Sequence, residues 1–228
     1  MGTKTILTQI PIFKGLSPKQ IETLSNTLVE INFKRDHIIF SEGDEATGFY
    51  ILISGRIKVF KISLEGKEQI LHIFGPGDIF GEVPMFEGNH FPANAETIEK
   101  SRLLFFQRSS LIELIKKEPN LAMNMLAALS IRLRQLAHLI EDLSLKEVPG
   151  RLAAYLLYLS DRVERNSELK LDIPKGQLAS LLGTIPETLS RIFNKTNRKG
   201  LIKIKGRKIR LLNKEALKEV AAGGKLLI

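Results

Sequence analysis

Three polar side chains in the last quarter of the chain have the types and the spacing that suit hydrogen bonding to the edges of DNA bases. Glu187, Ser190 and Arg191 fall on one face of a predicted helix. The opposite face of that helix is apolar and consists of Leu189, Ile192 and Phe193. Arginine can donate two hydrogen bonds to guanine, glutamate can accept one from cytosine, and serine can do either. These residues alone leave open an ordinary helix with a solvated polar face.

The segment before this helix predicts a helix-turn-helix. A first helix has an apolar face of Leu178, Leu181 and Leu182, and Gly183 is the residue type that often ends a helix. We expect Thr184 to be the N-cap of the second helix, with Glu187 in the capping-box position. Pro186 then falls in the first turn, where a missing backbone N–H costs little.

A basic segment follows the predicted helix-turn-helix. Residues 202–211 alternate apolar and basic side chains around Gly206, which predicts a two-stranded wing. Its cations nearest the tip are Lys205, Arg207, Lys208 and Arg210. Side chains of this kind contact DNA phosphates and fix the register of a protein on the duplex. We expect such backbone contacts from Lys175, Thr188, Lys195 and Lys205.

The distribution of charge favours double-stranded DNA as a partner. Residues 149–228 carry 17 Lys and Arg against 7 Asp and Glu, a net charge of +10. Residues 1–148 carry 17 against 18, a net charge of −1. Neutralising phosphates requires such a positive field. We expect no membrane partner, because the sequence has no basic amphipathic anchor and no long apolar run.

Residues 119–146 are predicted to form one long helix that begins at Pro119. Apolar residues recur along it at alternating spacings of four and three: Ala122, Leu126, Leu129, Leu133, Leu136, Ile140 and Leu143. Such a heptad seam is typical of two helices that pack across a two-fold axis. We therefore expect a homodimer with the last six of these residues at its interface. Leu121, Met125 and Leu139 widen the stripe, which leaves room for packing on the helix's own domain as well.

The N-terminal part of the chain is predicted to be all-β. Short apolar runs at 49–54, 56–62 and 69–74 are separated by turn signals and suggest a barrel or jelly roll. A small helix capped by Ser17, with Pro18 at its first position, precedes them. We therefore predict an α+β chain with a β-roll sensor domain in 1–118, a dimerisation helix in 119–148 and a winged helix-turn-helix in 149–228. Pro149-Gly150 is expected to break the long helix.

The chain contains no cysteine and four histidines. The missing cysteines exclude disulfides, thiolate nucleophiles and cysteine-ligated iron–sulfur clusters. A metal-dependent oxygenase or isomerase on such a barrel needs two or three converging histidines. Only His72 falls in a predicted strand, so we expect neither a metal site nor an enzyme. The start of the chain lacks the apolar core of a signal peptide, and we expect a soluble, cytoplasmic protein.

Four motifs, in this order and spacing, resemble the Crp/Fnr superfamily of bacterial transcription regulators. They are Phe40-x-x-Gly43-Asp44 with Tyr50-x-x-x-x-Gly55, Gly75-x-Gly77-Asp78-x-Phe80-Gly81-Glu82, Val148-Pro149-Gly150-Arg151, and Glu187-Thr188-Leu189-Ser190-Arg191. The resemblance covers nearly all of the chain. It implies a cyclic-nucleotide-binding-like sensor domain, a dimer helix and a winged helix-turn-helix. It also implies DNA and RNA polymerase as partners and allosteric control by an effector.

The resemblance also suggests where an effector would bind. The corresponding residues are Gly81, Glu82, Val83, Pro92, Ala93, Leu133 and Leu136. Relatives that bind cAMP carry an arginine ten residues after this glutamate, where the present chain has Pro92. Their hydroxyl-bearing positions on the dimer helix are Leu136 and Ala137 here, so we do not expect cAMP as the effector. Glu82 is then either a ligand contact or a capping or hinge group.

The remaining features resemble the branch of the family that responds to nitric oxide. Its members read Pro-Glu-Thr-x-Ser-Arg on the recognition helix, and some bind haem through an axial ligand; His72, His90 and His138 are candidates, and the sequence selects none of them. The Glu187, Ser190 and Arg191 set resembles regulators that read palindromes with TTGA-like arms. A cyclic-nucleotide-responsive regulator and a ligand-binding module that acts on a protein partner remain alternatives.

Overall fold

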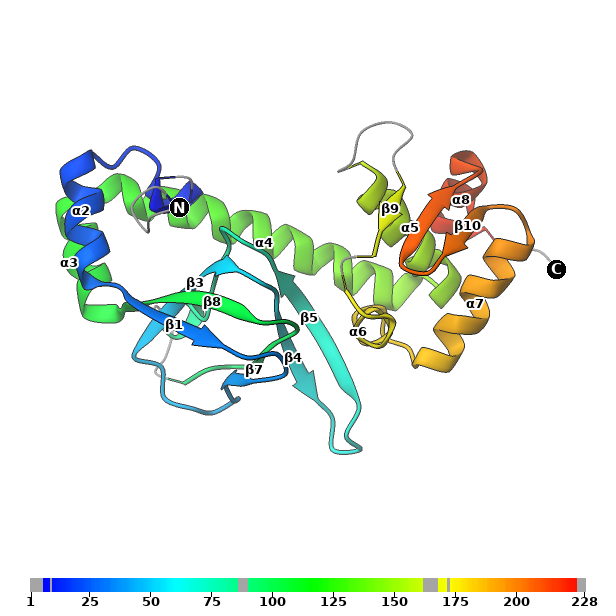
Figure 1. Ribbon diagram of the computed structural model, residues 1–228, viewed down its shortest axis with the longest axis horizontal. Coiled ribbons are helices and arrows are strands. Elements are labelled where there is room, and N and C mark those ends of the chain that lie inside the picture. Colours follow the sequence, from blue (N-terminus) through cyan, green and yellow to red (C-terminus); the bar gives the residue numbers. More distant parts are fainter. Residues whose placement is uncertain (1–5, 9, 86–89, 162–167, 172, 225–228) are drawn as a thin grey trace. The chain divides into compact units, whose positions relative to one another are not determined.

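A computed structural model describes residues 6–8, 10–85, 90–161, 168–171 and 173–224 (Figure 1). The chain divides into two compact units, and the boundary falls after Gln135. Strands dominate the first unit, one long helix runs from the first unit into the second, and the second contains a helix-turn-helix. The expected α+β class is therefore confirmed, whereas the boundaries of the three domains stay a prediction.

The strands of the first unit form two antiparallel sheets of four strands. One has the order β1 (Val29–Phe33), β8 (Ser101–Gln107), β3 (Gly48–Ser54) and β6 (Ile79–Phe80). The other has the order β2 (Ile38–Phe40), β7 (Asn94–Thr97), β4 (Ile57–Ile62) and β5 (Glu68–Phe74). Side chains from both sheets meet in one apolar core that includes Phe49, Ile51, Ile57, Phe74 and Phe106. The predicted strands are confirmed as β3, β4 and β5, within one residue at each end.

Within the described part of the chain, two helices precede the strands of this unit, a short one lies between β6 and β7, and one follows β8. They are η1 (Pro11–Phe13), α2 (Pro18–Thr27), η2 (Val83–Met85) and α3 (Arg108–Lys117). Ser17 caps α2 as expected, because its side chain accepts a hydrogen bond from the Gln20 backbone. The Gln20 side chain accepts from the Ser17 backbone in return, which completes a capping box, and Pro18 stands in the first turn.

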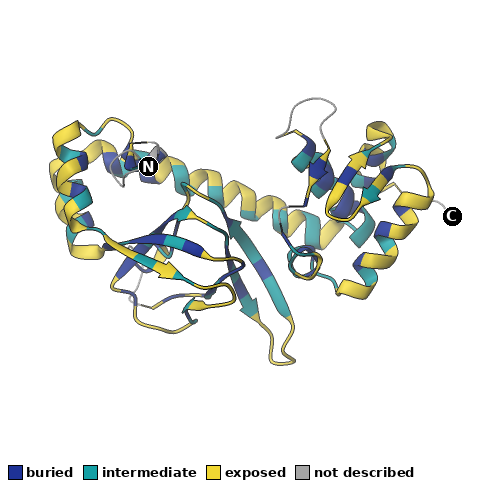
Figure 2. Ribbon diagram, in the orientation of Figure 1, coloured by how far each residue is buried: buried dark blue, intermediate teal, exposed yellow. Residues whose placement is uncertain are grey.

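The long helix α4 (Pro119–Leu145) matches the predicted helix to within one residue. Leu121 and Met125 near its start are buried in the core of the first unit. Further along, Leu126, Leu133 and Ile140 of the predicted seam are 56%, 70% and 65% exposed. Figure 2 shows this stretch of α4 largely as exposed surface. Among the described residues, no helix has the length and apolar character that crossing a membrane would require.

The second unit carries the C-terminal elements. They are α5 (Val148–Ser160), β9 (Leu169–Lys170), α6 (Lys175–Leu181), α7 (Pro186–Arg198), β10 (Ile202–Lys205), β11 (Lys208–Leu211) and α8 (Lys214–Ala221). Strands β10 and β11 pair around Gly206 as the predicted wing, and β9 extends them to a three-stranded sheet. The apolar faces of the helices and strands close a core that includes Leu156, Leu178, Leu189, Phe193 and Ile209.

One expectation for the start of α5 is corrected. Pro149-Gly150 does not separate the helices, because α5 begins at Val148 and Pro149 lies in its first turn, where no N–H is needed. Gly150 is buried, and a Cβ there would lie 3.1 Å from the Val220 carbonyl oxygen of α8. Glycine at this position therefore permits close packing of α5 on α8.

Candidate nucleic-acid interface and effector pocket

The turn between α6 and α7 is closed by backbone hydrogen bonds. Gly183, with φ +64°, donates to the Ser180 carbonyl at 3.3 Å, and Thr184 donates to the Ala179 carbonyl at 3.0 Å. This pair is a Schellman motif, which satisfies the last carbonyls of α6. Thr184 thus belongs to the motif that caps the C-terminal end of α6, and its expected role as N-cap of α7 is wrong. Ile185 is the N-cap, without a side-chain hydrogen bond, and Pro186 is the first residue of α7.

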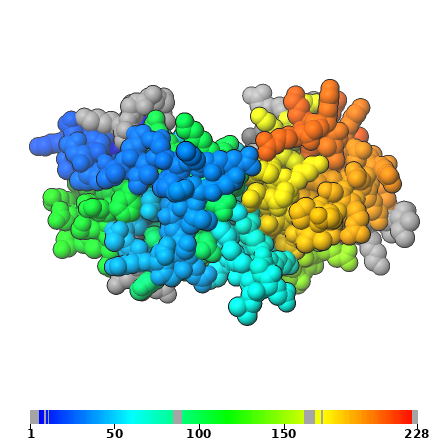
Figure 3. All heavy atoms as spheres, turned by 60° about the horizontal axis from the view of Figure 1, so that its bottom comes forward, coloured from blue at the N-terminus to red at the C-terminus, as the bar shows by residue number. Residues whose placement is uncertain are grey.

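The outer face of α7 carries the side chains predicted to read bases. Leu189 and Phe193 anchor the inner face in the core, which leaves Glu187, Ser190 and Arg191 exposed. Atoms of this segment lie on the surface of the second unit in Figure 3 (amber). The Arg191 guanidinium donates a hydrogen bond to the Thr188 hydroxyl at 3.1 Å. The structure therefore brings the three residues together on one exposed face and holds the arginine side chain along it.

The predicted phosphate contacts occupy three elements of the second unit. Lys175 is the first residue of α6, and its ammonium lies 5.4 Å from the centre of the Phe193 ring. Lys195 is exposed on α7, and Lys205 is exposed at the tip of the wing, whereas Thr188 is half-buried. Sequence reasoning missed one acidic neighbour of the wing. Glu168, just before β9, pairs with Lys208 at 3.0 Å.

The electrostatics of Glu168 reflect the positive field of the wing. Its hydrogen bond with Lys208 and the charge of that lysine hold the pKa of the Glu168 carboxyl below its usual range. Lys205 and Arg210 lower this pKa further. In return, the carboxylate neutralises part of the charge that would otherwise face a polyanion. If the wing binds phosphates as predicted, Glu168 should therefore weaken that binding.

Replacing Glu168 by glutamine should strengthen DNA binding without regard to sequence. The change frees the Lys208 ammonium for a phosphate, so the slope of log K against log[salt] should steepen by about 0.9. The measurement is fluorescence anisotropy on specific and random duplexes over a series of salt concentrations. Glu215→Gln is the matched control, because Glu215 pairs with Lys218 at 2.9 Å on α8. An equal gain in both variants would contradict the role given to Glu168.

An ion pair between buried Glu82 and half-buried Arg132 occupies the predicted effector region. Glu82 is 1% exposed, and its carboxylate accepts a hydrogen bond from the guanidinium of Arg132 on α4. The same guanidinium donates to the Ile79 carbonyl at 2.6 Å and lies 4.7 Å from the centre of the Phe74 ring. The second carboxylate oxygen, Oε2, is buried and has no hydrogen-bond partner among the residues that the structure describes. Sequence reasoning missed Arg132, because its partner lies 50 residues earlier and no local pattern links them.

Stacked aromatic rings lie beside Gly81, the residue that precedes Glu82. The rings of Phe40 and Phe91 stack with centroids 3.7 Å apart, and those of Tyr50 and Phe80 with centroids 5.4 Å apart. Burial raises the pKa of the Tyr50 phenol, which therefore stays neutral. Gly81 has φ +74°, and a Cβ there would lie 3.2 Å from Phe91 and 3.3 Å from Phe40. Glycine at this position thus lets the backbone approach the stacked rings.

The other predicted pocket residues are arranged less closely. Ala93 is buried, but Pro92 and Val83 are exposed. Leu133 on α4 is largely exposed and Leu136 is half-buried. The structure therefore places Gly81 and Glu82 near Arg132 or the aromatic rings and leaves Val83, Pro92 and Leu133 exposed.

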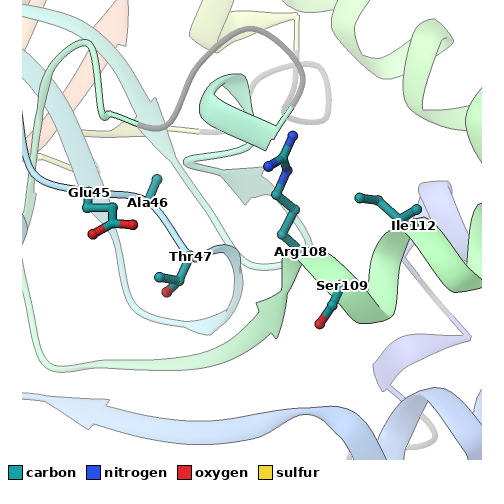
Figure 4. A pocket seen from close by; sticks show the side chains of 6 residues that line it. All are labelled: Glu45, Ala46, Thr47, Arg108, Ser109 and Ile112. Atoms are coloured by element: carbon teal, nitrogen blue, oxygen red, sulfur yellow. The ribbon is translucent and has the colours of Figure 1, made fainter.

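A separate open cavity of about 440 Å³ lies at the start of α3 (Figure 4). It is lined by Glu45, Ala46, Thr47, Arg108, Ser109 and Ile112. None of these is a residue predicted to bind an effector. The cavity therefore does not correspond to the predicted effector pocket.

Comparisons with known proteins identify both parts of the chain. A cyclic nucleotide-binding domain matches residues 30–118, and a Crp-like helix-turn-helix domain matches residues 150–220. The CRP-like cAMP-activated global transcriptional regulator of Mycobacterium tuberculosis is 32% identical over 216 residues, 93% of this chain and 96% of that protein. The fumarate and nitrate reduction regulatory protein of Escherichia coli is 29% identical, over 94% of this chain and 88% of that protein. The structure of FixK2 from Bradyrhizobium japonicum has a TM-score of 0.75 and 25% identity, covering 85% of this chain and 96% of that one.

A β-roll, a long helix and a winged helix-turn-helix, matched along nearly the whole chain, define a transcription regulator. The chain belongs to the Crp/Fnr family of these regulators, as the sequence motifs indicated. The relatives named above are regulators and not enzymes, in agreement with the sequence. Membership in the branch that responds to nitric oxide stays a prediction.

Proposed function

We propose that the protein is a homodimeric regulator that reads a DNA palindrome with TTGA-like arms through α7. The observation that carries this proposal is the exposed set of Glu187, Ser190 and Arg191 on a helix whose other face is buried. Arg191 would pair with a guanine in each arm, and Glu187 would accept from a base amine. Lys175, Thr188, Lys195 and Lys205 would hold the phosphate backbone, and RNA polymerase is the proposed protein partner.

The proposed dimer uses the seam on α4. Its residues are Leu126, Leu129, Leu133, Leu136, Ile140 and Leu143. Three of them are more than half exposed in the single chain, which leaves an apolar stripe uncovered. A second copy would cover it by isologous packing, in which the seam of one copy contacts the same seam of the other. Two reading helices related by a two-fold axis match the symmetry of a palindrome.

Replacing Leu133 by glutamate should dissociate the dimer. Each copy would then place a charge in an apolar interface, so the dimer dissociation constant should rise about 100-fold or more. Light scattering after size exclusion over a range of protein concentrations measures this change. Ile131→Glu is the control, because Ile131 is 54% exposed on the opposite face of α4. A dimer that tolerates Leu133→Glu as well as Ile131→Glu would argue against this interface.

The proposed effector is a molecule other than cAMP. Support comes from Pro92, which is exposed and carries no group that could pair with a phosphate, and from Arg132, which already pairs with Glu82. The name of the Mycobacterium tuberculosis relative includes activation by cAMP, so a cyclic-nucleotide-responsive regulator is the second candidate. Titration calorimetry with cAMP separates the two, and we expect no saturable heat.

Nitric oxide acting through haem is the effector that the sequence resemblance suggested. A haem site needs an axial donor beside an apolar slot. His90 and His138 are exposed, and the His72 ring packs against Phe74 with centroids 4.5 Å apart. Phe40 and Phe91 stack on each other rather than leaving room between them for a planar ligand. These residues do not fit a haem site, so we expect no Soret band in protein expressed with added haem.

Selection of bound sequences from random DNA tests the whole proposal. The experiment uses the full chain and is run twice, once without added ligand and once with cAMP. Enrichment of a palindrome with TTGA-like arms is the expected result in both runs. Enrichment of single half-sites, or no enrichment, would overturn it. Absence of DNA binding together with capture of RNA polymerase would instead favour a module that acts on a protein partner.

A further inference from the structure

The side chain of Arg151 joins two segments that the sequence keeps 36 residues apart. Arg151 lies in the first turn of α5 and is half-buried. Its Nε donates a hydrogen bond to the Lys146 carbonyl at 2.9 Å. Its Nη1 donates to the Leu182 carbonyl at 2.7 Å. One guanidinium thus bridges the residue that follows α4 and the residue that ends α6.

Both acceptors lie at the C-terminal ends of helices. Lys146 directly follows α4, and its N–H still donates to the Asp142 carbonyl at 3.1 Å. Leu182 is the C-cap of α6, immediately before Gly183 and the turn into α7. Such ends carry unpaired carbonyls and the negative pole of the helix dipole, so a cation there is held by charge as well as by hydrogen bonds. A planar guanidinium can reach two carbonyls at once, which a lysine ammonium does less well.

The last ten residues of α4 belong to the same compact unit as the reading helix. The boundary between the two units falls after Gln135, so Leu136, Ile140 and Leu143 of the proposed dimer seam lie in the second unit. The connection from α4 to α5 consists of Lys146 and Glu147 alone. An ion pair of Lys146 with Asp142 at 2.7 Å holds the first of these against α4. The direction of α4 at this junction should therefore set the orientation of α7, the proposed reading helix, relative to the dimer axis.

We propose that Arg151 is a positioning residue that fixes the end of α4 to the helix-turn-helix and thereby sets the half-site spacing that the dimer accepts. This inference rests on the proposed function, because spacing has meaning only for a dimer on a palindrome. Arg151 makes its two hydrogen bonds within the chain itself. It acts on DNA through the placement of α7, since both of its acceptors are backbone atoms at element ends.

The test compares palindromes whose two arms are separated by the selected spacer and by one base pair more or less. One added base pair turns the half-sites by about a tenth of a helical turn relative to each other. The affinity of the wild-type protein should fall about tenfold or more when the spacer is altered, a change within the usual range of coupling free energies. The affinity of Arg151→Met should fall less than about threefold, which is below that range. Affinity for a single half-site should stay equal in the two proteins.

Two further variants make the outcome decisive. Lys214→Met removes one positive charge from the exposed start of α8 and should keep the wild-type spacer preference. Arg151→Gln introduces a side chain that is neutral and too short to bridge both carbonyls. This variant is used in place of Arg151→Met if Arg151→Met unfolds below the temperature of the assay. A folded Arg151 variant with the wild-type spacer preference overturns the inference. A wild-type protein without any spacer preference overturns the proposed dimer on a palindrome instead.

Discussion

Replacing Arg191 by alanine should cost about 1–3 kcal/mol of binding free energy in each half-site. A dimer contacts two half-sites, so the loss on a palindrome should be about twice as large if the sites act independently. The physical reason is the loss of a bidentate hydrogen-bonded pair with guanine, for which the exposed guanidinium is held along α7 by Thr188. The protein should also discriminate less among the four bases at the position of that guanine.

The measurement is fluorescence anisotropy on four palindromes that differ only at the guanine assigned to Arg191. The wild-type protein should discriminate among them, and Arg191→Ala should bind all four about equally. Lys195→Ala is the control on the same helix, because an exposed lysine that contacts phosphate should lower affinity for all sequences alike. A uniform loss in Arg191→Ala as well would mean that Arg191 contacts phosphate.

Replacing Arg132 by methionine should lower the free energy of unfolding by about 3–5 kcal/mol, as breaking a buried ion pair commonly does. The reason is that Glu82, which is 1% exposed, would lose the cation that compensates its charge. The carbonyl of Ile79 would lose a donor in the same step. Urea denaturation followed by circular dichroism gives the change in stability.

The control and a second variant isolate the ion pair. Arg134→Met removes an exposed arginine two residues along the same helix and should change stability little. Combining Arg132→Met with Glu82→Gln should recover much of the loss, because no uncompensated charge then stays buried. Equal effects of Arg132→Met and Arg134→Met would show that the pair contributes nothing to stability.

Local sequence patterns were sufficient to predict the long helix, the helix-turn-helix and the wing. The apolar residues of α4 and α7 repeat with the helical period, and the wing alternates with the period of a strand, so each pattern identifies one element without knowledge of its partners. Proline and glycine at 186 and 183 act through their own backbone preferences. For the same reason the capping of α2 by Ser17 could be predicted, since its partner Gln20 is only three residues away.

Tertiary structure alone decided the features that depend on distant partners. Pro149-Gly150 reads locally as a break, yet Gly150 lies inside α5, where it packs closely against Val220 of α8. The bridges from Arg132 to Glu82 and from Arg151 to Leu182 link positions 50 and 31 residues apart. Periodicity records which face of an element is apolar, but it carries no information on which distant charge or carbonyl that element will meet.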